Sequence, residues 1–215
     1  MILTTLGTSH LGLPILSYQI GSGKKHALIL GGVHGDEIEG AAFVYALLEK
    51  CRSQPVDGLK ITFIPTFNVD GVLLKTRVNA RGVDLNRNLP TSDWKKEAFN
   101  PRYPPGETAN SENENQALTT FINSHKLDFI FSFHSFSKFL LNVNGNCEPI
   151  ASFIHKNTGY PIEESMGYPT PGCLGTYTGL EKGIPTITYE LERGKEIPVL
   201  ISQHLETVYK SLSLI

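Results

Sequence analysis

The sequence contains few cysteines, and none has the spacing of a zinc knuckle or a redox motif. Only Cys51, Cys147 and Cys173 occur in 215 residues, without a C-x-x-C pair. An odd number of widely separated cysteines is typical of reduced thiols. The segment before Lys24 contains no Lys or Arg and no sustained apolar run, which argues against a signal peptide. We therefore expect a cytoplasmic protein.

Long apolar runs and an excess of positive charge are also missing. No stretch approaches the ~18–20 apolar residues of a membrane span, so we expect no membrane partner. The 19 Lys and Arg residues against 21 Asp and Glu residues leave a net charge of −2, which argues against binding to nucleic acid. This low net charge, together with a hydrophobic fraction of 40%, argues against intrinsic disorder.

The apolar segments alternate between strand-like and helical patterns. Short runs rich in β-branched and aromatic residues predict buried strands at residues 26–30, 60–65, 128–133 and 185–189. Helical spacing predicts helices at residues 38–51, 149–157 and 197–212, and Ser111-Glu112-Asn113-Glu114 predicts a capping box at the start of another. The alternation indicates an α/β protein with a largely parallel sheet.

One polar segment, residues 89–111, is too long for a simple connection. It contains several prolines and lies between apolar segments, so we expect an ordered surface loop that forms a functional rim. We place no domain boundary there.

Chemically active side chains follow three of the predicted strands, where ligands bind in parallel sheets. His34 and Glu37 follow the first strand, His134 follows the third, and Glu190 follows the fourth. Two histidines and a carboxylate are the ligands of a catalytic zinc that keeps an open position for water. A further carboxylate nearby is what a zinc hydrolase needs as general base.

Each of these residues also has an ordinary interpretation. A His-x-x-Glu pair often occurs by chance, a histidine after a strand is commonly a hydrogen-bonded core residue, and Glu190 could be solvated. Glu192 has the same strand parity as Glu190 and competes with it for the role of base. The zinc interpretation depends on the joint placement of these residues at strand ends.

A polar segment follows the second predicted strand. It contains Asn68-Val69-Asp70-Gly71, Arg77 and the run from Asp84 to Asn88. Arg87 offers a planar fork that matches a carboxylate, with Asn86 beside it, and Arg77 could stabilise an oxyanion. The alternative is a surface loop with two solvated arginines.

Together these motifs resemble, in identity and order, those of the carboxypeptidase A-like zinc carboxypeptidases. The resemblance covers residues 28–191 and is closest to the short bacterial murein tripeptide amidases, which the segments 167–177 and 183–185 also resemble. The residues that carry it are His34-x-x-Glu37, Asn68-x-Asp70-Gly71, Arg77, Asp84-x-Asn86-Arg87-Asn88, His134-Ser135 and Glu190-Leu191. It implies a single domain over residues 1–215, with a mixed, largely parallel twisted sheet and helices on both faces.

The resemblance also implies catalytic roles. Asp84 would orient a histidine ligand, Glu190 would move a proton from the attacking water to the leaving amine, and Arg77 would stabilise the oxyanion. One zinc ion per chain would be bound by His34, Glu37 and His134.

The substrate implied is a small peptide with a free terminal carboxylate. The family resemblance points to the amide between γ-D-glutamate and meso-diaminopimelate in recycled cell-wall peptides. Asn86 and Arg87 would hold the carboxylate, and Tyr168 or Tyr177 would cover the substrate. The segment 172–178, which includes Thr176, would line the pocket for the terminal residue.

Two other functions remain open at this point. A deacylase resembling succinylglutamate desuccinylase or aspartoacylase shares the His-x-x-Glu and Asp-x-Asn-Arg elements, although Asn68-x-Asp70-Gly71 and the Gly-Ile-Pro approach to Glu190 favour the amidase. The other is a zinc-binding or peptide-binding module without activity.

Overall fold

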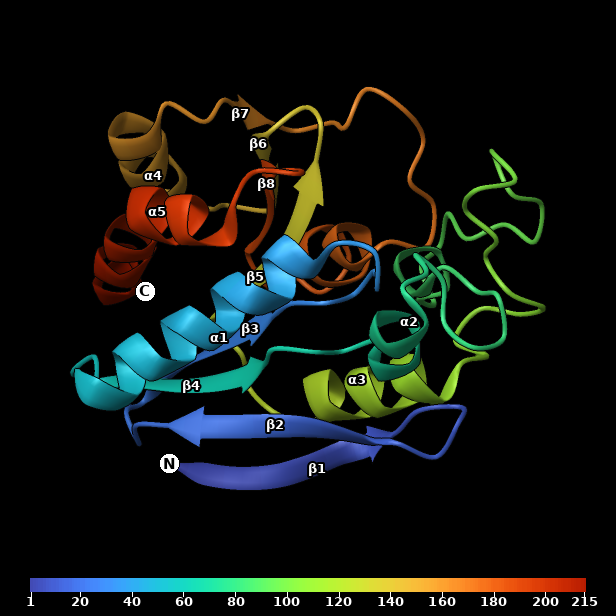
Figure 1. Cartoon of the computed structure of the whole chain (residues 1–215), viewed down its shortest axis with the longest axis horizontal. Helices are drawn as coiled ribbons and strands as arrows, with labels where there is room; N and C mark the ends of the chain where they lie inside the picture. The colour runs from blue at the N-terminus through green and yellow to red at the C-terminus, as the bar shows by residue number, and fades with distance from the viewer.

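A computed structural model describes all 215 residues and contains one eight-stranded sheet, in the order β1-β2-β4-β3-β5-β8-β6-β7 (Figure 1). The strands are β1 (Ile2–Thr8), β2 (Pro14–Ile20), β3 (Lys25–Leu30), β4 (Leu59–Ile64), β5 (Phe129–Phe136), β6 (Leu140–Asn144), β7 (Ile162–Glu163) and β8 (Thr186–Glu192). The four central strands β4, β3, β5 and β8 are parallel. Their carboxyl ends therefore meet at one edge.

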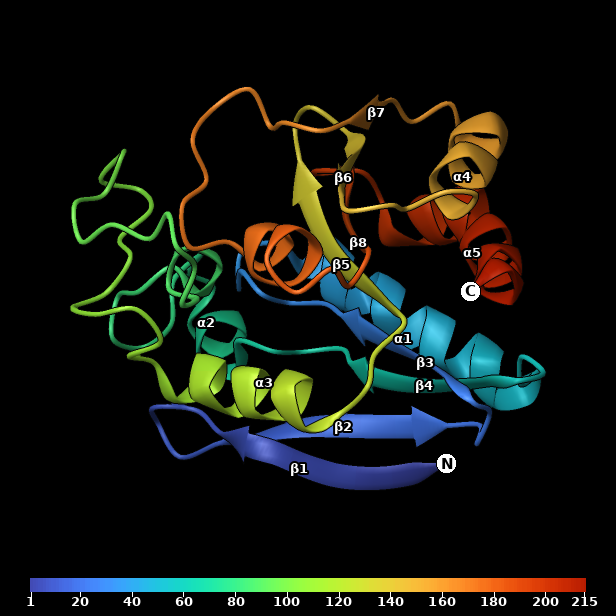
Figure 2. The same ribbon diagram turned by 180° about the vertical axis from the view of Figure 1, so that it is seen from behind.

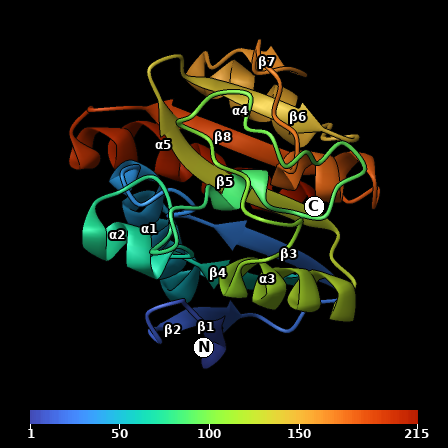
Figure 3. The ribbon, with the colours of Figure 1, turned by 90° about the vertical axis from the view of Figure 1, so that its right-hand side faces the viewer.

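Helices cover both faces of this sheet. The α-helices are α1 (Ile38–Ser53), α2 (Val69–Leu74), α3 (Asn113–Ser124), α4 (Ile150–Thr158) and α5 (Ile197–Ser211). Shorter helical turns are the 3₁₀ turns η1 (Leu85–Arg87) and η3 (Leu212–Leu214) and the π-helical η2 (Gly175–Leu180). In the view from behind, α3 lies in front of the sheet (Figure 2), and the side view places α1 and α3 on opposite sides of β3 (Figure 3).

Each face of the sheet has its own hydrophobic core, because side chains of a strand alternate between the two faces. In β3, Ile29 belongs to the core with Phe43 of α1, whereas Leu28 and Leu30 belong to the core with Leu118 of α3. All of these side chains are buried. A strand buried on both sides reads as a continuous apolar run, which is why residues 26–30 stand out in the sequence.

The α/β architecture, with its mixed and largely parallel sheet, is confirmed. The four predicted strands correspond to β3, β4, β5 and β8, and the helices beginning at residues 38, 150 and 197 match the predicted segments closely. The hairpin of β1 and β2, the strands β6 and β7, and the short helix α2 were not predicted. No helix has both the length and the apolar character needed to span a membrane.

The predicted capping box at Ser111 is wrong. Helix α3 begins at Asn113 with Glu112 as its N-cap, and no side chain caps it. The Ser111 hydroxyl instead donates to Glu112 Oε1, and the Glu114 carboxylate accepts from Asn79 Nδ2 and from His10 N. The two side chains that a capping box would need thus have other partners.

His204 of α5 gives the fold a defined pH dependence. It is buried beside Tyr189, whose hydroxyl lies 2.9 Å from His204 Nδ1. Burial and, to a smaller extent, Lys195 lower the pKa of His204 from 6.5 to about 4, and Glu192 opposes this shift. As the pH falls from about 6.5 to 4, the unfolded chain binds a proton that the folded chain rejects, so this contribution to stability is lost.

We therefore expect the melting temperature of His204→Asn to fall less than that of the wild type between pH 7.5 and pH 4.5. Asparagine keeps a polar group near the Tyr189 hydroxyl but does not titrate. The control is His10→Asn, because His10 is exposed and the substitution should leave the wild-type slope unchanged. An equal slope for His204→Asn would contradict the assignment.

Candidate active site

The loop from His34 to Glu37 leaves the carboxyl end of β3 and leads directly into α1. A Cβ atom at Gly40, in the first turn of α1, would collide with the backbone carbonyl of Phe133. The absence of a side chain there lets α1 pack closely against β5. This packing brings Glu37 next to His134. His134 lies within β5, because that strand continues to Phe136 and does not end at the predicted residue 133.

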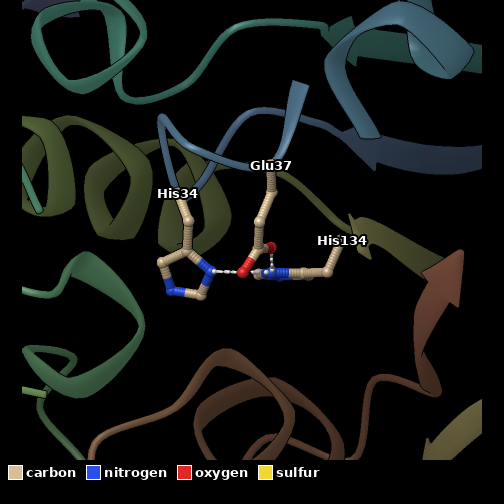
Figure 4. Close-up of side chains that lie close together, drawn as sticks. All are labelled: His34, Glu37 and His134. Atoms are coloured by element: carbon tan, nitrogen blue, oxygen red, sulfur yellow. Dashed lines mark hydrogen bonds and ion pairs between the residues drawn. The ribbon is translucent and has the colours of Figure 1, made fainter. Parts of the chain in front are cut away.

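The three predicted metal ligands converge on one point (Figure 4). His34 Nδ1 lies 3.0 Å from Glu37 Oε1, His134 Nδ1 lies 2.9 Å from Glu37 Oε2, and the two Nδ1 atoms are 3.1 Å apart. All three side chains are buried. Two ring nitrogens and a carboxylate, brought together away from solvent, form a donor set that suits zinc.

The second nitrogen of each ring is also held. His34 Nε2 lies 3.0 Å from Asp84 Oδ1, and His134 Nε2 lies 3.0 Å from the Ser132 hydroxyl. Because a carboxylate only accepts, Asp84 favours the His34 tautomer with a proton on Nε2, in which the lone pair of Nδ1 is available to a metal ion at the cluster. A carboxylate behind a histidine is the usual support of a zinc ligand.

Arg77 joins the two buried carboxylates. Its Nε donates to Asp84 Oδ2 at 2.9 Å and its Nη1 donates to Glu37 Oε1 at 3.0 Å. The Asn68-x-Asp70-Gly71 motif positions it: the Asn68 side chain accepts from Gly71 N, caps α2 and donates to the Arg77 carbonyl. Asp70 is buried and accepts from the Ser9 hydroxyl. This motif is therefore a support for the loop that carries Arg77.

Burial and neighbouring charges set the ionisation of the two glutamates. Burial acts to raise the pKa of Glu37, but the two adjacent histidines outweigh it and hold that pKa well below its ordinary value. Glu190 has less compensation, so burial, with repulsion from Glu37, raises its pKa to about 7. A carboxylate with a raised pKa in a cleft is suited to accept and return a proton.

Glu190 lies in the same cleft as the cluster, whereas Glu192 does not line it. Glu190 pairs in register with His134 across the parallel strands β5 and β8, so both side chains leave the same face of the sheet. Glu192 is more exposed and binds Lys195 Nζ at 2.6 Å. The structure thus brings Glu190, but not Glu192, to the cluster.

Asn86, Arg87 and Tyr168 also line this cleft. Asn86 is fixed because its Oδ1 accepts from Leu174 N at 2.9 Å, and Arg87 Nη1 donates to the Asn86 carbonyl at 2.6 Å. The ring of Tyr103 lies against both Arg77 and Arg87 and stacks at 6.0 Å on Tyr168. An amide, a guanidinium and aromatic faces here suit a planar anion.

Comparison with known proteins agrees with this site. The zinc carboxypeptidase family model matches residues 1–159. The chain belongs to the zinc carboxypeptidase family. It is 34% identical over 201 residues to murein peptide amidase A of Vibrio campbellii, covering 87% of this chain and 78% of that protein. It is 28% identical over 183 residues to murein peptide amidase A of Escherichia coli K12, covering 80% and 74%.

The fold of this zinc carboxypeptidase is similar to the crystal structure of murein-tripeptide amidase from Escherichia coli O157. The TM-score is 0.82 with 24% sequence identity, over 98% of this chain and 91% of that one. Family membership and the relatives identify the protein as a hydrolase of the metallocarboxypeptidase and amidase type. The buried His-Glu-His cluster is a set of donors that could hold the zinc ion of this zinc-dependent family.

Two residues expected at the substrate do not line the cleft of this zinc carboxypeptidase. Tyr177 is buried in η2, and its hydroxyl lies 3.4 Å from Asn123 Oδ1 on α3. Thr176 faces Cys173 Sγ through its hydroxyl. The π-helical turn directs Tyr177 into the core, so of the two candidate tyrosines only Tyr168 reaches the cleft.

Several cleft residues have no signal in the sequence. Tyr103 and Arg102 come from the polar segment 89–111, which was expected to form a rim but not to supply these side chains. Asn142 lies on β6 and Thr188 on β8, and Arg193 follows β8. Only the polarity of Asn142 and Thr188, which are buried within strands, could have marked them.

We expect His34→Ala to lose stoichiometric zinc, because two of the three ligands then remain. Asp84→Asn should keep the metal but bind it about 10–100-fold more weakly, since the residue only supports a ligand. Metal analysis of purified protein and competition with a chelator measure both effects.

The control for this experiment is His125→Ala, because His125 is exposed and outside the cluster. It should retain the same zinc content as the wild type. Stoichiometric zinc in folded His34→Ala would contradict the ligand assignment.

Proposed function

We propose that this enzyme hydrolyses the amide before a terminal carboxylate-bearing residue, and that its substrate is the γ-D-glutamyl–meso-diaminopimelate bond of murein peptides. One observation carries the proposal. His34 and Glu37 of the buried His34–Glu37–His134 cluster, a carboxylate with a raised pKa and the arginine of an Asn-Arg pair line one cleft. The names of the two bacterial relatives support the substrate class.

The protein groups divide the reaction between them. Zinc, when bound by His34, Glu37 and His134, would act as a Lewis acid and favour the deprotonated form of water. Glu190 accepts a proton from the attacking water and delivers it to the leaving amine. A cation at the cluster would lower the pKa of this carboxyl below about 7, which favours the base form at neutral pH.

Arg77 has a double role in the proposal. Its Nε and Nη1 hold Asp84 and Glu37 in place, while its guanidinium also lines the cleft. Because the side chain is already fixed by these carboxylates, it can stabilise a developing oxyanion with little reorganisation.

Asn86 and Arg87 would hold the free carboxylate of the terminal residue. Arg87 is buried, and apart from the Nη1 bond to the Asn86 carbonyl its guanidinium makes no hydrogen bond within the protein. Such a guanidinium is available for a bidentate carboxylate. Tyr168, stacked on Tyr103, would cover the substrate from above this pair.

Asn142 and Thr188 give one part of the cleft a polar but uncharged lining. Asn142 donates its amide to the Glu163 carbonyl, which leaves its Oδ1 as an acceptor, and Thr188 offers a hydroxyl. The far end of diaminopimelate carries both an ammonium and a carboxylate, so its net charge is near zero. A neutral pocket with donors and acceptors fits such a group without leaving a buried charge unpaired.

We also propose a place for this activity in the cell. The three cysteines are free, which is consistent with a reducing compartment such as the cytoplasm. An amidase acting there on small murein peptides would serve cell-wall recycling. We further propose that residues 1–215 act as a single catalytic domain with one zinc ion.

A substrate panel tests the proposed function. We expect the zinc-loaded protein to release diaminopimelate from L-Ala-γ-D-Glu-meso-diaminopimelate, and to lose this activity when the carboxylate at the scissile amine is amidated. Ordinary C-terminal peptides and N-acyl amino acids complete the panel. Preferred release of acetate or succinate would favour a deacylase, and stoichiometric zinc without turnover of any substrate would favour a binding module.

We expect Glu190→Gln to bind zinc normally but to lower kcat by about 10²–10⁴-fold, because glutamine cannot accept the proton. Glu192→Gln is the matched control, since the same change two residues away removes a carboxylate outside the cleft. Its kcat should stay near the wild-type value. The reverse result would assign the role of base to Glu192.

A further inference from the structure

The cleft contains more positive charge than a single terminal carboxylate requires. Its lining includes two glutamates but four arginines, which are Arg77, Arg87, Arg102 and Arg193. Arg77 is occupied by Asp84 and Glu37, and Arg87 is assigned above to the terminal carboxylate. Arg102 and Arg193 have no role in that scheme.

Arg193 is fixed on one side only. Its Nη2 donates to the Asp36 carbonyl at 2.9 Å and to Asp36 Oδ2 at 2.7 Å. Its Nη1 lies 3.9 Å from Glu37 Oε1, too far for a hydrogen bond. Neither Nη1 nor Nε has a hydrogen-bond partner in the protein, and the side chain is 31% exposed. The guanidinium is therefore held in place with donors to spare.

Arg102 adds a second cation at the same place. Its Nη2 lies 3.9 Å from Asp36 Oδ2, and its side chain is 57% exposed. Two guanidinium groups thus share a single carboxylate, so one positive charge at this point of the cleft is not balanced by Asp36.

Arg193 approaches the metal cluster through different residues than Arg87 does. Arg87 belongs to the η1 turn, which contacts the cluster through Asp84. Arg193 instead contacts the cluster through Asp36 and Glu37. Arg77 separates the two groups, because it binds Asp84 through Nε and Glu37 through Nη1. If Arg87 holds the leaving residue, Arg193 is placed to contact the acyl residue.

We propose that Arg193, held by Asp36 and assisted by Arg102, binds a second free carboxylate on the acyl side of the scissile amide. This inference rests on the proposed function. An amide formed through the side-chain carboxyl of glutamate leaves the α-carboxylate of that residue free, whereas an ordinary peptide has no anion there. Arg193 would thereby select γ-linked over α-linked substrates.

Two substrates that differ in one group test this proposal. The first is L-Ala-γ-D-Glu-meso-diaminopimelate, and the second has the α-carboxylate of its D-Glu converted to the neutral carboxamide. For the wild type we expect amidation to lower kcat/KM by about 10–100-fold, the range expected for a lost charge-assisted hydrogen bond. Arg193→Gln should lower kcat/KM on the first substrate by a similar factor and should show almost no discrimination between the two.

A control variant and the possible outcomes separate this proposal from the proposed function. Lys195→Gln also removes one positive charge near the end of β8, but Lys195 does not line the cleft, so its discrimination should equal that of the wild type. Equal cleavage of both substrates by the wild type, or unchanged discrimination in Arg193→Gln, would overturn the role of Arg193 while leaving the amidase activity established. Release of diaminopimelate from neither substrate would overturn the proposed function, and this inference with it. The wild-type comparison stands even if Arg193→Gln does not fold.

Discussion

The burial of Glu37 between two histidine rings is the interaction on which the active site depends. A carboxylate removed from water is costly unless other groups compensate it. Here His34, His134 and Arg77 all contact it. This contact requires β3 and β5 to be parallel neighbours and α1 to begin directly against β5. The packing of α1 on β5 is so close that any side chain at Gly40 would collide with Phe133. The arrangement of β3, β5 and α1 thus places the buried carboxylate of Glu37 between its partners.

The same burial determines how the arginines are used. Arg77 neutralises Glu37 and Asp84, so two of its donors are used before any substrate arrives. Arg87 and Arg193 each bind one nearby backbone carbonyl and keep other donors free. An arginine that binds protein carboxylates on two sides supports the site and acts from a fixed position, whereas one held on a single side has donors free for a substrate carboxylate. Position in the cleft alone does not make this distinction.

The sequence predicts those parts of the structure whose signal is local. The buried central strands are apolar on both faces, and the residues at their carboxyl ends are the ones that chemistry requires, so His34, Glu37, His134 and Glu190 could be selected together. Strand β1 is mostly exposed at an edge and shows no buried face, so its pattern carries little information. Which tyrosine reaches the cleft depends on a π-helical turn. Tyr103 comes from a loop without periodicity, and only tertiary contacts place it there.

Net charge turns out to be a poor guide to the ligand of this protein. The chain as a whole carries −2, which excludes a broad basic surface, yet the cleft is lined by four arginines and two glutamates. Charges separated by more than about 8–10 Å interact weakly at physiological salt, so a small anion responds to the groups that line the cleft rather than to the total. An acidic enzyme can therefore bind an acidic substrate, provided that its cations are fixed where the carboxylates lie and its acids are already paired. The Asp84–Arg77–Glu37 chain meets the second condition for two of the acids, because Arg77 binds both carboxylates and leaves the other guanidinium groups available.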